Sequence, residues 1–225
     1  MIFFVACTLS HKDTFVEHFE ESGVTELPFL LDFPLLEREK FQQRVGVDHD
    51  REEQEGILGR LECTDYQGRA FPHCYDQHEG SDFILSGGFS AMDSGSAHII
   101  AAASGEVTLA QDGNYDRCHG SIESADVTCD GHPIRANAVI IVHPEGFQTL
   151  YWHMMKDSVV VSVGDYVERG DALGKVGSSG YSSMPHLHFE LQDMQENIID
   201  PYAGEYSQEE SYWCDQDDPL PRPCD

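Results

Sequence analysis

The chain has 225 residues, 40% of them hydrophobic and 10% aromatic, and its formal net charge at pH 7 is −28. This length and composition predict a globular protein with one well-packed core, with or without appendages. The negative charge argues strongly against a nucleic-acid partner, because phosphate binding needs basic patches, and it argues against docking to anionic lipid. No stretch approaches the roughly 20 apolar residues of a transmembrane span.

Residues 1–60 are acidic and predict an N-terminal extension without recognisable chemistry. Residues from about 8 to 60, which include the apolar segment 29–36, are expected to form a wrap that packs on the main domain. We expect a short helix over 37–45. The trio Asp48-His49-Asp50 is either a metal-binding group or an exposed polar turn, and the turn is the favoured interpretation.

Seven cysteines are typical of an exported, disulfide-bonded protein. The first, Cys7, follows six apolar residues and is either the lipidated residue of a lipoprotein signal, which would anchor the chain, or a buried thiol. The apolar run is too short, and its basic flank is missing, for a complete signal. Three close pairs could each form a disulfide, although spacing alone does not fix the pairing. These are Cys63 with Cys74, Cys118 with Cys129, and Cys214 with Cys224.

Residues 61–205 predict an all-β main domain. Short β-branched runs alternate here with glycine and other turn residues, and few segments show helical periodicity. The acidic tail, 206–225, is expected to be a surface extension held by a Cys214–Cys224 bridge. The predicted strands are 98–103, 105–109, 138–142, 149–152, 158–163 and 172–176.

Two short segments of this domain carry the donors of a metal site. One reads H-x-G-x-D and supplies His78 and Asp82; the other reads P-H-L-H-F-E and supplies His186 and His188. Residues i and i+2 of a β-strand point to the same face, so the last two histidines project into one site. Two His and one Asp form the ligand set of a catalytic zinc, whose fourth position is left to water. We therefore expect one Zn²⁺ per chain, with a spare His beside it.

Three further segments complete a family pattern. Residues 149–153 read T-x-Y-x-H and end in His153, residues 163–171 read V-G-D-x-V-x-x-G-D, and residues 177–185 are rich in Gly and Ser. With the two metal motifs, they resemble the M23 (lysostaphin-type) zinc metallopeptidases over about residues 76–204. Members of that family cut peptide bonds in bacterial peptidoglycan.

The resemblance implies a role for each motif residue. It implies zinc ligation by His78, Asp82 and His188, and catalytic roles without metal binding for His153 and His186. These two would hydrogen-bond the attacking water or the oxyanion, and one would carry the proton to the leaving amine. The substrate implied is a peptidoglycan cross-bridge or stem peptide, cut by an endopeptidase through a zinc-activated water.

The resemblance also implies a fold and a location. The fold is a mainly antiparallel β-sheet sandwich with a narrow groove, of the duplicated-hybrid-motif or barrel-sandwich type. The protein would be exported to the periplasm, the outer envelope or the medium. The alternative is a non-enzymatic scaffold or regulator of wall hydrolases with the same fold, against which the complete ligand set argues. A biotinyl or lipoyl carrier shares the hairpin pattern, but neither Lys156 nor Lys175 sits in a carrier motif.

Two segments depart from the family pattern and are expected on the rim of the groove. They are the longer stretch 83–97 and an insertion over 112–135. The insertion is either a second zinc site or a loop pinned by a disulfide, and the disulfide is favoured in an exported chain. The four residues concerned are Cys118, His119, Cys129 and His132.

Overall fold

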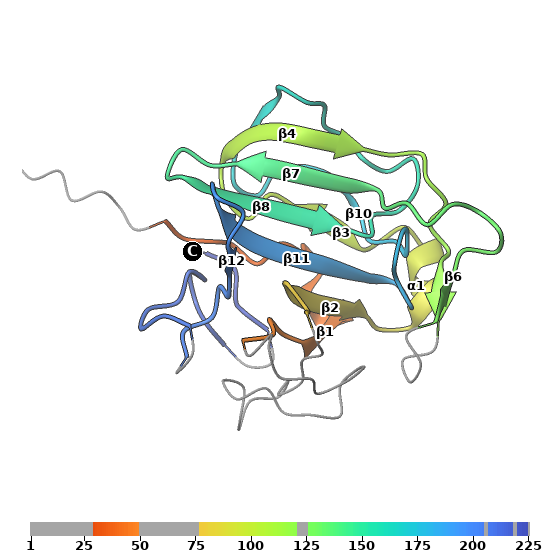
Figure 1. Ribbon diagram of the computed structural model, residues 1–225, viewed down its shortest axis with the longest axis horizontal. Coiled ribbons are helices and arrows are strands. Elements are labelled where there is room, and N and C mark those ends of the chain that lie inside the picture. The colour runs from red at the N-terminus through yellow and green to blue at the C-terminus, as the bar shows by residue number, and fades with distance from the viewer. Residues whose placement is uncertain (1–28, 50–76, 121–125, 205–206, 218–219, 225) are drawn as a thin grey trace, which may run out of the picture.

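The computed structural model describes residues 29–49, 77–120, 126–204, 207–217 and 220–224 (Figure 1). Antiparallel strands dominate, with one short α-helix and one 3₁₀ turn among these residues, so the predicted all-β fold class is confirmed. In chain order the elements are η1 (Arg38–Lys40), β1 (Phe41–Val45), β2 (Ser81–Leu85), α1 (Gly88–Asp93), β3 (His98–Ile100), β4 (Gly105–Gln111), β5 (His119–Gly120), β6 (Val127–Thr128), β7 (Ala138–Val142), β8 (Phe147–Trp152), β9 (Tyr166–Val167), β10 (Ala172–Lys175), β11 (His186–Asp193) and β12 (Ile198–Ile199).

One large antiparallel sheet organises the molecule. Its strands run in the order β1-β2-β11-β8-β7-β4-β9, and β12 adds to β11. The long strand β11 thus lies between β2 and β8, although β2 and β11 are about a hundred residues apart in sequence. The small sheet β10-β3 lies behind the large one in Figure 1, and the pair β5-β6 lies at one end.

The core lies against one face of β2, β8 and β11. Leu187, Phe189 and Leu191 of β11 have no exposed surface, and neither has Phe83 of β2 or Tyr151 of β8. Because successive side chains of a strand point to opposite faces, the residues between these must face the other side of the sheet. That other face carries the polar residues of both metal motifs.

Segments from both ends of the described chain complete this core. Leu31, Phe33 and Leu35 are at most 1% exposed, so the described part of the predicted N-terminal wrap packs on the core. Leu31 also forms a β-bridge with Trp213 of the tail. Trp213 is 2% exposed and packs edge-on or tilted against Phe83 and Phe189. The prediction of a surface tail is therefore wrong at Trp213, whose indole is part of the core. The indole covers large apolar side chains on the inner face of β2 and β11.

Two predicted elements are wrong. Residues 37–45 form a 3₁₀ turn followed by β1, not a helix, because pairing with β2 satisfies the backbone and buries Phe41 and Val45. Residues 158–163 form no strand. Here the carboxylate of Asp112 accepts hydrogen bonds from the backbone N–H groups of Asp157 and Val159, in place of a strand ladder.

The structure contains two of the three expected disulfides, Cys118–Cys129 and Cys214–Cys224. Cys7, Cys63 and Cys74 lie outside the described residues.

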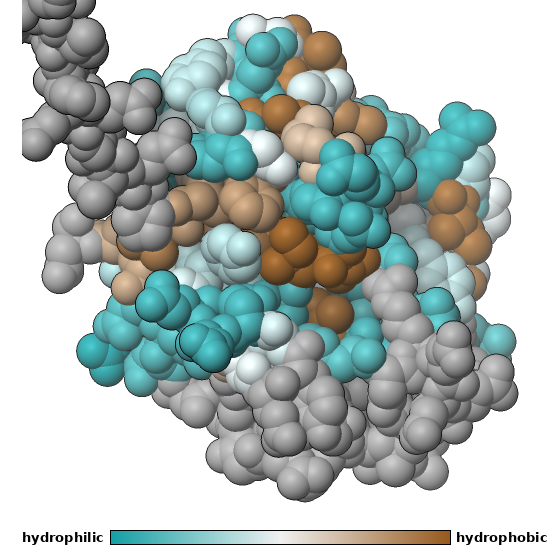
Figure 2. All heavy atoms as spheres, turned by 60° about the vertical axis from the view of Figure 1, so that its left-hand side comes forward, coloured by the Kyte–Doolittle hydropathy of each residue, from teal (hydrophilic) through white to brown (hydrophobic). Residues whose placement is uncertain are grey.

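Within the described parts of the chain, no helix is long and apolar enough to cross a membrane. Figure 2 shows a face that is largely hydrophilic with apolar side chains gathered across its middle. Among the described residues the buried carboxylates are those of Asp48, Asp82, Glu190 and Asp200.

Candidate metal centre

The H-x-G-x-D segment runs into β2 and turns two donors toward β11. His78 precedes the strand and is 2% exposed; its Nδ1 donates a hydrogen bond to the carbonyl of Gly46, 2.6 Å away. A carbonyl only accepts, so the lone pair of His78 is on Nε2. Asp82, within β2, is 6% exposed and lies beside it.

The third donor comes from β11, which pairs with β2 in a fixed register. His188 stands directly opposite Asp82 of β2 and opposite Trp152 of β8. This register brings together two motifs separated by about a hundred residues of sequence. His186 lies two residues earlier on the same face, as the strand period requires.

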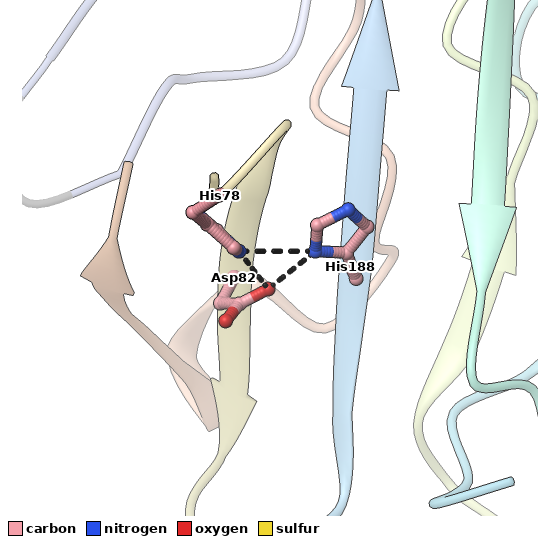
Figure 3. A group of neighbouring side chains, drawn as sticks. All are labelled: His78, Asp82 and His188. Atoms are coloured by element: carbon pink, nitrogen blue, oxygen red, sulfur yellow. Dashed lines mark hydrogen bonds and ion pairs between the residues drawn. The ribbon is translucent and has the colours of Figure 1, made fainter. Parts of the chain in front are cut away.

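Three donor atoms converge on one point: one from His78 before β2, one from Asp82 of β2 and one from His188 of β11 (Figure 3). The distances are 3.1 Å from His78 Nε2 to His188 Nδ1, 3.2 Å from His78 Nε2 to Asp82 Oδ1, and 2.8 Å from His188 Nδ1 to Asp82 Oδ1. Ligands about 2.0–2.1 Å from a tetrahedral Zn²⁺ are roughly 3.3 Å apart. The spacing and the N/N/O chemistry of this donor set fit a zinc ion with one open position.

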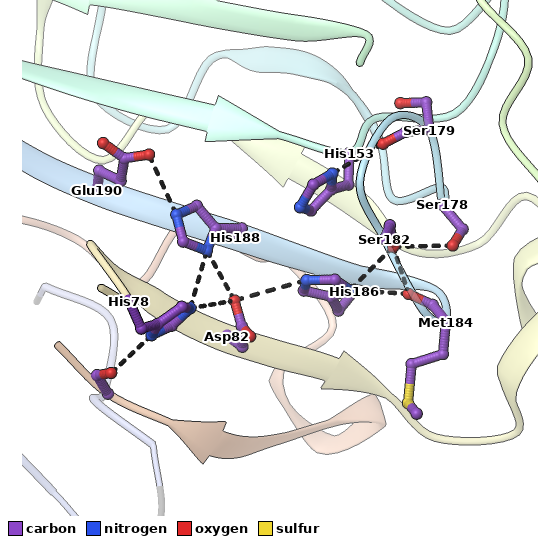
Figure 4. A network of polar contacts seen from close by, with 11 residues as sticks. His78, Asp82, His153, Ser178, Ser179, Ser182, Met184, His186, His188 and Glu190 are labelled. Carbon is purple, nitrogen blue, oxygen red and sulfur yellow. Dashed lines mark hydrogen bonds and ion pairs between the residues drawn. The ribbon is translucent and has the colours of Figure 1, made fainter. Parts of the chain in front are cut away.

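The two other motif histidines lie beside these donors (Figure 4). The ring centroids of His153 and His186 are 4.7 Å apart, and His153 is 5.9 Å from His188. The Nδ1 of His153 donates to the carbonyl of Ser179 at 2.7 Å, and that of His186 donates to the carbonyl of Met184 at 2.7 Å. Both rings therefore carry a lone pair on Nε2 when neutral.

His153 has an uncommon backbone conformation. It follows the last residue of β8 with a φ of 65°, in the left-handed region that few non-glycine residues adopt. Its carbonyl accepts a hydrogen bond from Gly177 N, at 3.0 Å. A side chain at Gly177 would collide with the backbone of Met155, so the glycine lets the Gly/Ser-rich segment approach closely. That approach is what holds the His153 ring at the site.

Burial and neighbouring charges set the pKa values here. Burial by itself would raise the pKa of Asp82, but His78 and His186 hold it well below its usual range. Burial, helped by His186 and His188, lowers the pKa of His153 well below its usual value. Burial opposes protonation of His188 too, yet its hydrogen bonds to Asp82 and Glu190 raise its pKa to about 10. A cation at this site would replace that proton.

A groove of about 210 Å³ opens above these residues. Sequence reasoning assigned no role to several residues of its wall, among them Glu190, Trp152 and Tyr181. The i, i+2 relation to His188 was the available signal for Glu190, whereas nothing local marks Trp152 or Tyr181. The lining residues are Gln77, His78, Glu79, Trp152, His153, Tyr181, His188 and Glu190.

The described part of the insertion over 112–135 contains no second zinc site. Cys118 and Cys129 are joined in a disulfide, which removes both thiolates as ligands. His119 is exposed, and the ring of His132 stacks on Tyr115 with the centroids 4.2 Å apart. The loop lies against the Gly/Ser-rich segment through backbone hydrogen bonds such as Cys118 N to Ser178 O, at 2.9 Å.

The trio at 48–50 is not the exposed turn that was favoured. Asp48 is 2% exposed and its carboxylate accepts a hydrogen bond from Gln77 N, just before His78. The imidazole of His49 lies 3.0 Å from the carboxylate of Asp200. Buried carboxylates need such partners, and these contacts tie the chain after β1 to the start of the metal motif. Asp50 lies outside the described residues.

Comparisons with known proteins assign the chain to a family. Residues 77–201, more than half of the chain, match Peptidase family M23, so the chain belongs to that family. An uncharacterized metalloprotease of Buchnera aphidicola subsp. Baizongia pistaciae is 23% identical over 183 residues, which is 81% of this chain and 36% of that protein. The peptidoglycan DD-endopeptidase ShyA of Vibrio cholerae is 40% identical over 60 residues, 27% of this chain and 14% of that protein.

A crystal structure of a zinc-containing peptidase from Vibrio cholerae is similar at 21% identity with a TM-score of 0.48. The match covers 76% of this chain and 39% of that one. The chain thus spans only about a third or less of the length of the first relatives that it matches.

Proposed function

We propose that this protein is a zinc-dependent endopeptidase that hydrolyses peptide bonds in bacterial peptidoglycan, in cross-bridges or stem peptides. The observation that carries the proposal is the convergence of three donor atoms, from His78, Asp82 and His188, beside two imidazoles whose Nε2 atoms are free of backbone carbonyls. A non-enzymatic scaffold would need neither feature. Membership of family M23, together with relatives named as peptidoglycan endopeptidases, supports the substrate class.

The chain's own residues supply the proton transfers. Zinc, when bound, would act as a Lewis acid and would lower the pKa of a coordinated water to about 7. His153 lines the groove, and its Nε2 can accept a proton from the attacking water and return it to the leaving amine. His186 is 6% exposed with Nε2 3.5 Å from Asp82 Oδ1. As an imidazolium, with a proton on both ring nitrogens, it would donate a hydrogen bond from Nε2 to the oxygen that develops negative charge.

The decisive experiment is digestion of purified peptidoglycan by the full chain, with and without a zinc chelator, followed by mass spectrometry of the products. Release of muropeptides that stops with the chelator and returns with added zinc is the expected result, and the products name the bond cut. Zinc content is measured on the same preparation. A protein with neither bound zinc nor release would favour the scaffold, and a protein with zinc but no release would contradict the substrate.

We also propose that the protein works outside the cytoplasm. The disulfides Cys118–Cys129 and Cys214–Cys224 support an oxidising compartment, where such bridges form and persist. Its proposed substrate lies in the same compartment. Fractionation of the source cells, with thiol alkylation before reduction, should find the chain in the envelope or the medium with these four cysteines protected.

A further inference from the structure

The four imidazoles of the site are oriented in two different ways. His78, His153 and His186 each donate Nδ1–H to a backbone carbonyl, those of Gly46, Ser179 and Met184 respectively. The backbone is present whatever the side chains are, so no single substitution removes these acceptors. His188 is the exception, because its partner is a side chain.

The partner of His188 is Glu190. The distance from His188 Nε2 to Glu190 Oε1 is 3.1 Å, and Figure 4 shows the carboxylate on the side of the ring away from His78 and Asp82. His188 consequently faces the donor cluster with Nδ1, while His78 faces it with Nε2. Nδ1 carries a lone pair for a metal only when the ring proton is on Nε2, and a carboxylate acceptor at Nε2 selects that tautomer.

Glu190 is itself held in place. Its second oxygen accepts a hydrogen bond from the amide of Gln192 at 2.6 Å, and the amide oxygen of Gln192 accepts one from Gln148 at 2.8 Å. His188, Glu190 and Gln192 are alternate residues on one face of β11, so the strand sets their spacing. Glu190 is 6% exposed in a chain with 41 acidic residues, and few of those in the described parts are buried. Burying a carboxylate is costly unless it has such partners.

Gly80 of the H-x-G-x-D motif packs over this pair. A Cβ there would lie 3.0 Å from His188 Nε2, 3.0 Å from Glu190 Cγ and in collision with the carbonyl of Phe189. Gly80 does not have a left-handed φ, so space and not conformational freedom requires the glycine. The glycine between the first two donors thus makes room for the contact that orients the third.

We propose that Glu190 is a positioning residue for the metal: it fixes the Nε2–H tautomer of His188 and so directs Nδ1 at the cation. The proposal rests on the zinc site of the proposed function. Acceptors that orient a metal-bound imidazole typically contribute a factor of about 10 to 100 in metal affinity.

The test is the zinc affinity of the full chain, measured by competition with a chromophoric chelator. Glu190→Ala should raise the Kd for zinc about 10- to 100-fold. Glu190→Gln keeps an acceptor oxygen, because the amides of Gln192 and Gln148 can reverse, and should give a smaller rise. Glu106→Gln is the control, since Glu106 is exposed on β4 and does not line the groove. It removes the same charge away from the metal and should change the Kd by no more than about twofold.

A second readout separates positioning from a merely structural role. With Co²⁺ in place of zinc, Glu190→Ala should alter the visible d–d spectrum, and Glu190→Gln should restore it toward the wild type. Far-UV circular dichroism establishes that each variant is folded. If Glu190→Ala does not fold, the comparison of Glu190→Gln with Glu106→Gln decides the question.

The outcomes distinguish this inference from the proposed function. A folded Glu190→Ala that binds zinc as the wild type does, or equal losses of zinc affinity in Glu190→Gln and Glu106→Gln, would overturn the role of Glu190 and leave the zinc site standing. A wild-type protein that binds no zinc would overturn both.

Discussion

The two faces of β11 differ in what they bury. One face turns Leu187, Phe189 and Leu191 into the core with no exposed surface. The other face carries His186, His188 and Glu190, which are also mostly shielded from water, and the last two of these line the groove. One strand therefore serves as the wall of the core and as the floor of the candidate site. The comparison teaches that the packed face supplies rigidity to the polar face, so substitutions on the two faces should affect different properties.

The largest effect is expected at His188, on the polar face. His188→Ala removes one of three donors, so zinc content should fall from about one ion per chain to none, and peptidoglycan cleavage should cease. Metal analysis and the digestion assay check this. His119→Ala, at an exposed position outside the groove, is the control and should keep both properties. Retention of stoichiometric zinc by folded His188→Ala would contradict the assigned ligand set.

His153→Ala should separate chemistry from metal binding. Loss of a positioned proton acceptor should lower the cleavage rate about 10²- to 10⁴-fold, while zinc remains bound because His153 is outside the donor cluster. The rate of muropeptide release and the zinc content are measured together. His132→Ala serves as the comparison variant, and full activity in His153→Ala would rule out this role.

On the packed face the expected effect is on stability. Phe189 contacts the rings of Tyr151 and Trp213, and Phe189→Ala should lower the free energy of unfolding by about 3–5 kcal/mol. Denaturant unfolding gives the value, with Phe189→Leu as a milder volume change. Zinc affinity of the folded fraction should stay near that of the wild type; a loss comparable to that of His188→Ala would mean that the two faces are not separable.

The smallest effect is expected from removing one member of a series of buried, hydrogen-bonded polar groups. Hydrogen bonds link Ala102 N to the Tyr151 hydroxyl, then Thr149, His143 and the carbonyl of Ser104. Burial raises the pKa of Tyr151 to about 12, so its hydroxyl stays neutral. Tyr151→Phe leaves a buried N–H unpaired and should cost about 1–3 kcal/mol of stability, measured by thermal unfolding. An unchanged melting temperature would show that water or Thr149 replaces the hydroxyl.

Local sequence signals predicted the elements that depend on alternation. The strand 138–142 coincides with β7, and the i, i+2 rule correctly predicted that His186 and His188 share one face of a strand. The meeting of His78 and Asp82 with His188 came from the family resemblance, since no local pattern reveals which strands pair. The resemblance also carried the position of His153, whose left-handed φ has no signal in its own residue type.

The predictions that were wrong also depend on contacts with segments that are distant in sequence. The β-branched run at 158–163 indicates a strand, but Val160 and Val163 are 67% and 64% exposed. The carboxylate of Asp112, which is distant in sequence, instead accepts hydrogen bonds from the local backbone. At 37–45 the partner strand β2 decided the conformation. Strand alternation places Glu190 on the same face as His188, but it does not reveal which ring nitrogen of His188 the carboxylate contacts, so the sequence alone does not predict a role for Glu190.

The family match and the core have different limits. Similarity to family M23 spans 77–201, yet Phe33 and Phe41 before that range and Trp213 and Leu220 after it are all at most 4% exposed. The range that matches the family is therefore shorter than the range that contributes to the core. A boundary chosen for expressing this domain should therefore lie outside 29–224, because trimming to 77–201 would remove Trp213, whose ring packs against Phe83 and Phe189.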